Sequence, residues 1–313
     1  MSFIKRIIQI LVSLGLLSYL IYLTDLNTLK NNFRQINIFY CLLCFIFIYL
    51  GLFLSSTRWM LIFRRFGYRI NSFESFIIYW LGSFYNNFLP TSVGGDGFRA
   101  IFLIRRKKSP SKSVLGSILL ERGTGLLSIG CINIALAPMF FQNISSSSSF
   151  FFLESVVFCF SVLLLLVFLF HRIIYRVAEK LFRSWTIWRK FVEFLDFLTT
   201  SLSLVDILVT LALSLLFYAE ITIANFFLFK AIGVGSVSLL FILFAISINS
   251  VLGVLPISFN SIGITEALFV FLYTSYGISS DLAILMVILG RFLPLIATSF
   301  AGLIPLFSMK YSI

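Results

Sequence analysis

The sequence is poor in charged residues and in the side chains that most enzymes use for catalysis. Only 12% of its 313 residues are Asp, Glu, Lys or Arg, which is about half the share found in soluble domains. It has one histidine, His171, and it contains no Gly-x-Ser-x-Gly motif, no P-loop and no pair of histidines at metal-ligand spacing. These absences argue against a soluble globular domain and give no reason to expect an enzyme.

Cysteine is also scarce. The four thiols all lie within apolar runs, at Cys41, Cys44, Cys131 and Cys159. The first two stand one helical turn apart, but no second pair and no histidine lies near them. We interpret the cysteines as small buried apolar residues rather than metal ligands, and we expect no disulfide framework. The sequence therefore predicts neither a metal nor another cofactor.

Hydrophobic residues make up 60% of the chain, and the mean hydropathy is +1.05. Six runs are long enough to cross a bilayer as helices. They lie at residues 7–23, 38–56, 113–139, 150–170, 205–229 and 282–307. We interpret the first run as a retained span, because Thr24, Asp25 and Leu26 offer no small-residue cleavage site for a signal peptidase. This composition predicts an all-α polytopic membrane protein.

Two further apolar segments are interrupted by proline and glycine. The first has arms at 73–89 and 98–104, and the second has arms at 237–256 and 264–276. The pattern Leu89-Pro90-x-Ser92-x4-Gly97 recurs in the second segment as Leu255-Pro256-x-Ser258-x4-Gly263. Proline and glycine break a helix, and irregular backbone at membrane depth needs a cover of protein or a wet cavity. We therefore interpret both segments as re-entrant helical hairpins.

Each half of the chain then reads as span, span, hairpin, span, which predicts a single domain built as an inverted repeat. We place the first half at about 1–141 and the second half at about 150–313. Residues 171–197 alternate basic and apolar side chains at helical spacing, which is typical of an amphipathic helix on the membrane surface. The arms of both hairpins could instead cross the membrane fully, which would change the number of spans but keep the repeat.

The net charge of +12 reports orientation rather than a nucleic-acid partner. With the N-terminus inside, the outer loops hold only Lys30, Arg34 and Lys230 of the 24 Lys and Arg residues. The segment after the second span, from Arg58 to Arg69, then forms part of a basic inner surface. We expect an integral protein of a prokaryotic cell membrane, with both termini in the cytoplasm.

Two arginines lie inside predicted spans, Arg122 and Arg291, each in the span that follows a hairpin. A charge inside the bilayer costs about 2.5–3.5 kcal/mol on insertion scales, so it needs a partner or a function. Arginine can grip a phosphate in a fork, and helix N-termini add backbone donors. The sequence predicts a site for an anionic headgroup. Its candidate residues are Arg99, Arg122, Arg291, Asn87, Ser92, Gly94, Gly95, Asp96, Glu121, Ser258 and Glu266.

The alternative is an internal network of ion pairs. Asp96, Glu220 and Glu266 can neutralise the arginines across helices, whereas Glu121 and its neighbour Arg122 point apart on one helix. Glu266 also suits the positive end of the helix that it opens. Both interpretations stay open, because a substrate can compete with a carboxylate for an arginine.

Three motifs resemble those of the lysylphosphatidylglycerol synthase transmembrane-region family, which includes flippase-like domains. They run from Leu89 to Arg99, from Leu119 to Gly125, and from Leu255 to Ala267. The resemblance implies a free-standing member, without the synthase domain, that moves an anionic phospholipid or lipid-linked headgroup between leaflets. It implies membrane lipids as partners, and it leaves open a homo-oligomer or a separate lipid-modifying enzyme.

The alternative function is a lipid-modifying integral membrane transferase, or its membrane subunit, with Asp96 or Glu266 as a base. A scaffold that recruits a partner through the basic helix at 171–197 is a third possibility.

Overall fold

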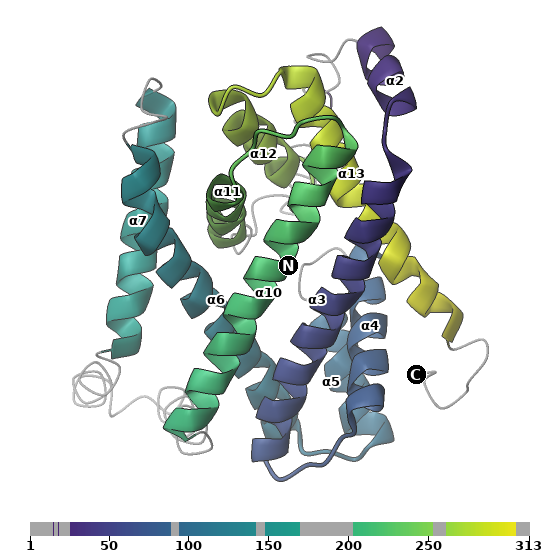
Figure 1. The fold of residues 1–313 in the computed structure, drawn as a ribbon. Helices are drawn as coiled ribbons and strands as arrows, with labels where there is room; N and C mark the ends of the chain where they lie inside the picture. The colour runs from purple at the N-terminus through teal and green to yellow at the C-terminus, as the bar shows by residue number, and fades with distance from the viewer. Residues whose placement is uncertain are drawn as a thin grey trace.

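The computed structural model describes residues 15, 18, 26–88, 94–141, 148–169, 203–252 and 261–304. These residues form ten α-helices and one 3-10 helix, and no strand occurs among them (Figure 1). The all-α prediction is therefore confirmed for this part of the chain. Four expectations lie outside the described residues: nearly all of the first span, the surface helix at 171–197, Ser92 and Ser258.

In the described part of the chain, four helices are long and apolar enough to cross a membrane. They are α3 (Ile38–Arg65), α6 (Ser111–Phe141), α10 (Leu204–Ala231) and α13 (Ser280–Ser299), which the 3-10 helix η2 (Phe300–Leu303) continues. They match the second, third, fifth and last predicted spans. The fourth predicted span corresponds to α7 (Ser148–Leu169). The chain is thus an integral membrane protein.

Two boundaries differ from the prediction. The segment after the first span, which we expected to be a short loop, contains the helix α2 (Leu26–Arg34). The second span does not end at residue 56, because α3 continues as one 28-residue helix to Arg65. This extension places Arg58 inside the helix bundle, where it is only 7% exposed, and not on the basic inner surface.

The helices α3 and α10 lie side by side through the middle of the molecule and pack on each other more extensively than any other pair (Figure 1). Small residues are buried on these helices, among them Gly51 and Ser55 of α3 and Ser214 of α10. Small side chains let helix backbones approach closely in a membrane. The opposite face of α3 exposes Ile38, Leu42, Ile46, Leu50 and Phe53 at helical spacing, as expected of a surface that faces lipid.

Two pairs of shorter helices surround the predicted breaks. The first pair is α4 (Ser72–Phe88) and α5 (Gly94–Arg106), and the second is α11 (Leu239–Leu252) and α12 (Ile264–Ser275). The longest of the four has 17 residues, fewer than the roughly 20 that a spanning helix needs. In Figure 1 the first pair lies at the lower end of the bundle and the second pair at the upper end.

Each pair belongs to its own apolar core. One core joins α4 and α5 to Trp59 and Phe63 of α3 and to Val114 of α6. The other joins α11 and α12 to α13, α10 and the second half of α6. The two hairpins are thus held by separate sets of side chains, one at each end of the α3–α10 pair.

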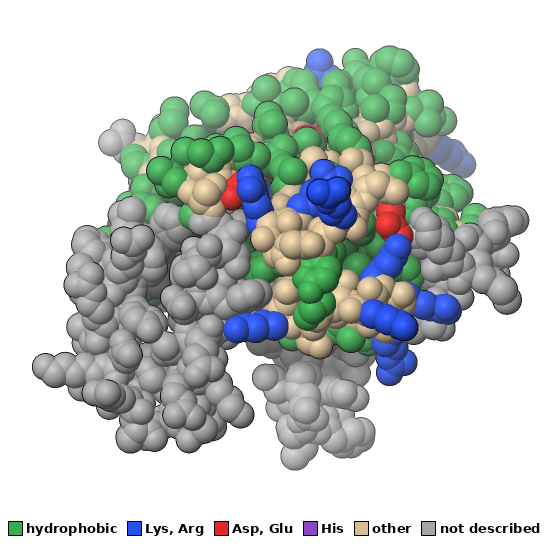
Figure 2. Space-filling model, turned by 90° about the horizontal axis from the view of Figure 1, so that it is seen from below, with side chains coloured by type: hydrophobic (Ala, Val, Ile, Leu, Met, Phe, Trp, Pro, Cys, Tyr) green, Lys and Arg blue, Asp and Glu red, His purple; other side chains and the backbone are tan. Residues whose placement is uncertain are grey.

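The lower face of the molecule is rich in cations (Figure 2). Its exposed basic residues come from the ends of α3 and α5, from the turns after them and from the first turn of α6: Arg64, Arg65, Arg69, Arg105, Arg106, Lys107, Lys108 and Lys112. Two salt bridges tie helix ends together here. Arg65 pairs with Asp206 of α10 at 2.6 Å, and Lys107 pairs with Glu74 of α4 at 2.7 Å.

Candidate functional site

The helices α4 and α5 approach each other closely at their backbones. The amide of Gly95 donates a hydrogen bond of 2.6 Å to Oδ1 of Asn86. A Cβ atom built on Gly95 would overlap the carbonyl oxygen of Gly82, so only glycine fits there. Gly94 is the first residue of α5, and Asp96 lies in its first turn. Gly94 and Gly95, predicted as substrate contacts, therefore begin the helix that presents Asp96 to the bundle.

Arg99 lies at the centre of a buried charge network. Its Nη1 is 2.8 Å from Oε2 of Glu121, and its Nη2 pairs with Oδ1 of Asp96. The guanidinium carbon also lies 4.8 Å from the ring centre of Trp59 and 4.5 Å from that of Tyr79, so both rings add cation–π contacts. The Arg99 side chain is 4% exposed. The structure therefore places this predicted ligand in the interior, where protein groups use its donors.

Glu121 joins three helices to this arginine. Its Oε1 accepts a hydrogen bond of 2.8 Å from the Tyr79 hydroxyl and lies 3.4 Å from Nη2 of Arg58. Arg58 donates a second hydrogen bond, of 2.7 Å, to Oγ of Ser214 on α10. Glu121, one of the predicted substrate contacts, thus lies inside the network where α3, α4, α5 and α6 meet.

Arg58 is not among the predicted site residues, because the basic residues that follow it suggest a surface segment. A usable signal was present. Arg58 follows Gly51 and Ser55 at seven and three positions, so it shares their helix face, which packs on α10. A buried arginine needs a carboxylate within reach, and Glu121 supplies it.

Arg122 differs from the other two arginines because its side chain is 55% exposed. Its Nε and Nη2 both lie 2.9 Å from Oδ2 of Asp96, whose other oxygen pairs with Arg99. One carboxylate is thus shared between a buried and an exposed guanidinium. Taken together, the five charged side chains of the network comprise three arginines and two carboxylates, so the group carries one excess positive charge. Such a group can attract an anion.

A second pair repeats this arrangement in the other half of the chain. Nε of Arg291 lies 3.7 Å from Oε1 of Glu266, and the Arg291 side chain is 40% exposed. Oε2 of Glu266 accepts a hydrogen bond of 2.6 Å from the amide of Gly263, so the carboxylate also caps α12, as its position predicted. In both halves, a carboxylate in the first turn after the break pairs with a partly exposed arginine of the next helix.

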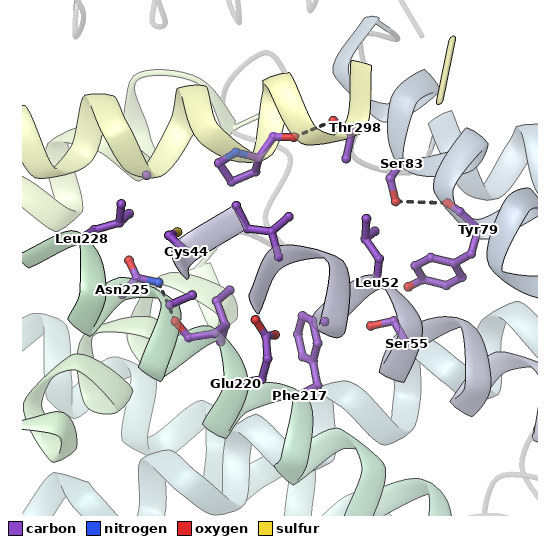
Figure 3. A pocket seen from close by; sticks show the side chains of 16 residues that line it. Cys44, Leu52, Ser55, Tyr79, Ser83, Phe217, Glu220, Asn225, Leu228 and Thr298 are labelled. Atoms are coloured by element: carbon purple, nitrogen blue, oxygen red, sulfur yellow. Dashed lines mark hydrogen bonds between the residues drawn. The ribbon is translucent and has the colours of Figure 1, made fainter. Parts of the chain in front are cut away.

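Asn87 connects the first hairpin to the last long helix. Its Nδ2 donates a hydrogen bond of 2.7 Å to Oγ1 of Thr298 on α13. Glu220 contacts none of the described arginines, although the sequence made it a candidate to neutralise one. It lines a cavity of about 290 Å³ between α3, α4, α10 and α13 instead (Figure 3).

Within the described ranges, no group of three or more His, Cys, Asp and Glu side chains could hold a metal ion. Cys44 is buried and Cys41 is half-buried, but Cys131 and Cys159 are exposed. The prediction that all four cysteines are buried is therefore wrong for the last two, which lie on the outer surfaces of α6 and α7.

Long apolar helices around a buried charge network define a polytopic helical membrane protein with an ionic site between its helices. A family model described as the lysylphosphatidylglycerol synthase TM region matches residues 6–302. The chain belongs to this family, which confirms the resemblance found in its motifs.

A curated relative adds a partial match. The UPF0104 membrane protein MJ1595 of Methanocaldococcus jannaschii is 30% identical over 122 residues. These residues make up 39% of this chain and 35% of the relative. The match therefore spans about a third of the relative's length and supports similarity in that part alone.

Proposed function

We propose that the protein binds an anionic lipid headgroup and moves it between the leaflets of the membrane. The observation that carries this proposal is the exposure of the Arg122 side chain within a positively charged network. This side chain is more than half exposed, yet it lies in a network with an excess of positive charge and shares its carboxylate with Arg99. A phosphate can approach the exposed side of this guanidinium without leaving a buried charge unpaired.

The exchange of partners follows from the geometry of Asp96. When a phosphate takes the fork of Arg122, Asp96 keeps its bond to Arg99, and Arg99 keeps its bond to Glu121. The buried part of the network therefore stays satisfied while the exposed part changes its ligand. Arg291 offers a similar arginine in the second half, where Glu266 keeps its capping bond to Gly263.

The arrangement of the hairpins supports a path between leaflets. Four helices too short to span, paired at opposite ends of the bundle, fit two re-entrant hairpins that enter from opposite sides (Figure 1). The cationic face at the end of α3 and α5 fits the cytoplasmic side under the positive-inside rule (Figure 2). We therefore propose an inverted repeat whose two arginine sites serve the two leaflets, in a prokaryotic cell membrane.

The ion pairs weaken the case for a transferase. A general base needs a free lone pair near the reacting proton, whereas Asp96 is engaged by two arginines and Glu266 by Arg291 and a backbone amide. These contacts favour transport over lipid modification.

The test is a translocation assay in reconstituted vesicles. Vesicles that contain fluorescent phosphatidylglycerol are treated with a membrane-impermeant quencher, with and without the protein, and the lipid is then analysed by mass spectrometry. We expect faster loss of inner-leaflet fluorescence and no change in lipid mass. A lipid of new mass, formed without faster exchange between leaflets, would favour the transferase.

A further inference from the structure

Glu220 lies near the middle of α10, and its side chain faces the cavity between α3, α4, α10 and α13 (Figure 3). The residue is only 5% exposed. A carboxylate at the centre of a spanning helix is costly, and such residues commonly mark ion pathways or proton relays. The arginine network does not use Glu220, so the residue calls for a separate explanation.

No positive charge compensates this carboxylate within the described part of the chain. Glu220 makes no hydrogen bond and no ion pair there, and no Lys or Arg lines the cavity. The titratable side chains that line it with Glu220 are Cys44 of α3 and Tyr79 of α4.

The charged groups on the helices packed on α10 are engaged elsewhere. Arg58 of α3 pairs with Glu121 and donates a hydrogen bond to Ser214. The helix α11 has no ionisable residue in its sequence. Glu121 and Arg122 of α6 are bonded to other residues of the network, and Arg291 of α13 pairs with Glu266.

Three of the four hydroxyl groups that line the cavity are already committed, and the fourth, on Ser55, makes no hydrogen bond to Glu220. Ser83 donates to the carbonyl of Tyr79, and Thr298 donates to the carbonyl of Pro294, each within its own helix. The Tyr79 hydroxyl donates to Glu121. None of these three groups donates to Glu220, so the carboxylate has neither a cation nor these donors to stabilise its negative charge.

Gly51 makes room for the carboxylate on the facing helix. A Cβ atom built on Gly51 would overlap Oε2 of Glu220 and would lie 3.0 Å from its carboxyl carbon. The carboxylate of Glu220 on α10 therefore packs directly against the backbone of Gly51 on α3. A side chain held in this way, at a cavity and without a counter-charge, has the features of a site that takes up a single small cation.

We propose that this cavity is a proton-binding site and that the Glu220 carboxylate is the proton acceptor. The proton comes from water, forms an O–H bond on one carboxylate oxygen and leaves by the same route. A bound proton removes the negative charge and gives the side chain a donor for the cavity. A metal cation fits less well, because it needs several oxygen ligands and the cavity supplies a single carboxylate.

The proton site adjoins the arginine network through one residue. Tyr79 lines the cavity and donates its hydrogen bond to Glu121, which pairs with Arg99 and Arg58. A change of charge on Glu220 therefore affects Tyr79, which belongs to both the cavity and the arginine network. The inference goes beyond the proposed lipid transport, and it holds or fails independently of it.

The test is infrared difference spectroscopy of the whole protein in lipid nanodiscs, recorded across a pH titration. A protonated glutamate shows a carboxylic-acid C=O band that an ionised one lacks. We expect such a band to titrate in the wild type and to be lost in Glu220→Gln, which mimics the neutral acid in shape. Glu154→Gln changes another buried acid, in α7, whose carboxylate oxygens also have no hydrogen-bond partner among the described residues. It should remove only a band of its own and leave the Glu220 band in place.

If Glu220→Gln does not fold, two further measurements can still assign the band to Glu220. Labelling with 13C-glutamate should shift the band, and Gly51→Ala should shift it again by displacing the carboxylate. Identical spectra for the wild type and Glu220→Gln at every pH would overturn the proposal. Loss of the band on addition of Na⁺ at fixed pH would also overturn it, since the occupant would then be a metal ion. Neither result depends on lipid translocation, which the vesicle assay measures separately.

Discussion

Oδ2 of Asp96 lies 2.9 Å from both Nε and Nη2 of Arg122, while Oδ1 of the same carboxylate pairs with the buried Arg99. Because the carboxylate is shared, Arg99 and Arg122 can have different roles. The inner arginine holds α4, α5 and α6 together, and the outer arginine keeps an exposed side for an anion.

Replacing Arg122 with alanine should weaken the binding of anionic lipid. A hydrogen bond to a charged group contributes about 1.5–3 kcal/mol, so we expect roughly 10–100-fold lower affinity for phosphatidylglycerol. Native mass spectrometry of the purified protein with added lipid measures this loss. The matched control is Arg105→Ala, an exposed arginine of the cationic face, which should retain the affinity of the wild type. Equal losses in both variants would mean that general surface charge, not this site, binds the lipid.

Replacing Asp96 with asparagine should destabilise the protein. Removing one partner of a buried ion pair costs about 3–5 kcal/mol, because it leaves the other charge poorly compensated. Here the affected charge is Arg99, whose side chain is 4% exposed. The free energy of unfolding in mild detergent tests this expectation.

The control for that change is Arg65→Ala, which breaks the salt bridge to Asp206. The Arg65 side chain is 56% exposed, and exposed pairs contribute about 0–1 kcal/mol. A stability of Asp96→Asn equal to that of Arg65→Ala would contradict a structural role for the network.

Two glycines of α5 should respond in opposite ways to alanine. Gly95→Ala drives a methyl group into the backbone of Gly82, and overpacking of this kind typically costs about 1–3 kcal/mol. Gly97 has no atom within 4 Å of the same position, so Gly97→Ala should leave stability unchanged or raise it by up to about 1 kcal/mol through helix propensity. Thermal unfolding of the two variants measures the difference. A Gly95→Ala variant as stable as Gly97→Ala would argue against the close contact of α4 with α5.

The orientation can be tested with single cysteines in a background without the native ones. Arg69→Cys lies on the cationic face, and Lys30→Cys lies on α2 at the opposite end of the bundle (Figure 1). A membrane-impermeant thiol reagent added to intact cells should label Lys30→Cys, and it should reach Arg69→Cys only after the cells are opened. The reverse pattern would invert the proposed topology.

The sequence predicted the helices well because their signals are local. Proline and glycine marked the break after α4, and the expected first arm at 73–89 agrees with the observed Ser72–Phe88 within one residue. The start of α12 at Ile264 was also predicted, since Gly263 and Glu266 form a typical helix start.

The pairing of charges was harder to predict because it depends on helices far apart in the sequence. The basic residues after position 56 suggested the end of a span, yet α3 continues because Arg58 finds Glu121 and Ser214. The alternative of an internal network is confirmed for Asp96 and Glu266, and it is wrong for Glu220, which faces a cavity instead.

The most direct test of lipid movement compares translocation rates in vesicles for the wild type, Arg122→Ala, Arg291→Ala and Arg105→Ala, at equal amounts of folded protein. We predict that the wild type and Arg105→Ala move fluorescent phosphatidylglycerol at the same rate, and that each of the other two variants moves it at least about 10-fold more slowly, as expected for the loss of one charge-assisted contact. Wild-type rates in both Arg122→Ala and Arg291→Ala would contradict an anion path built on these two arginines.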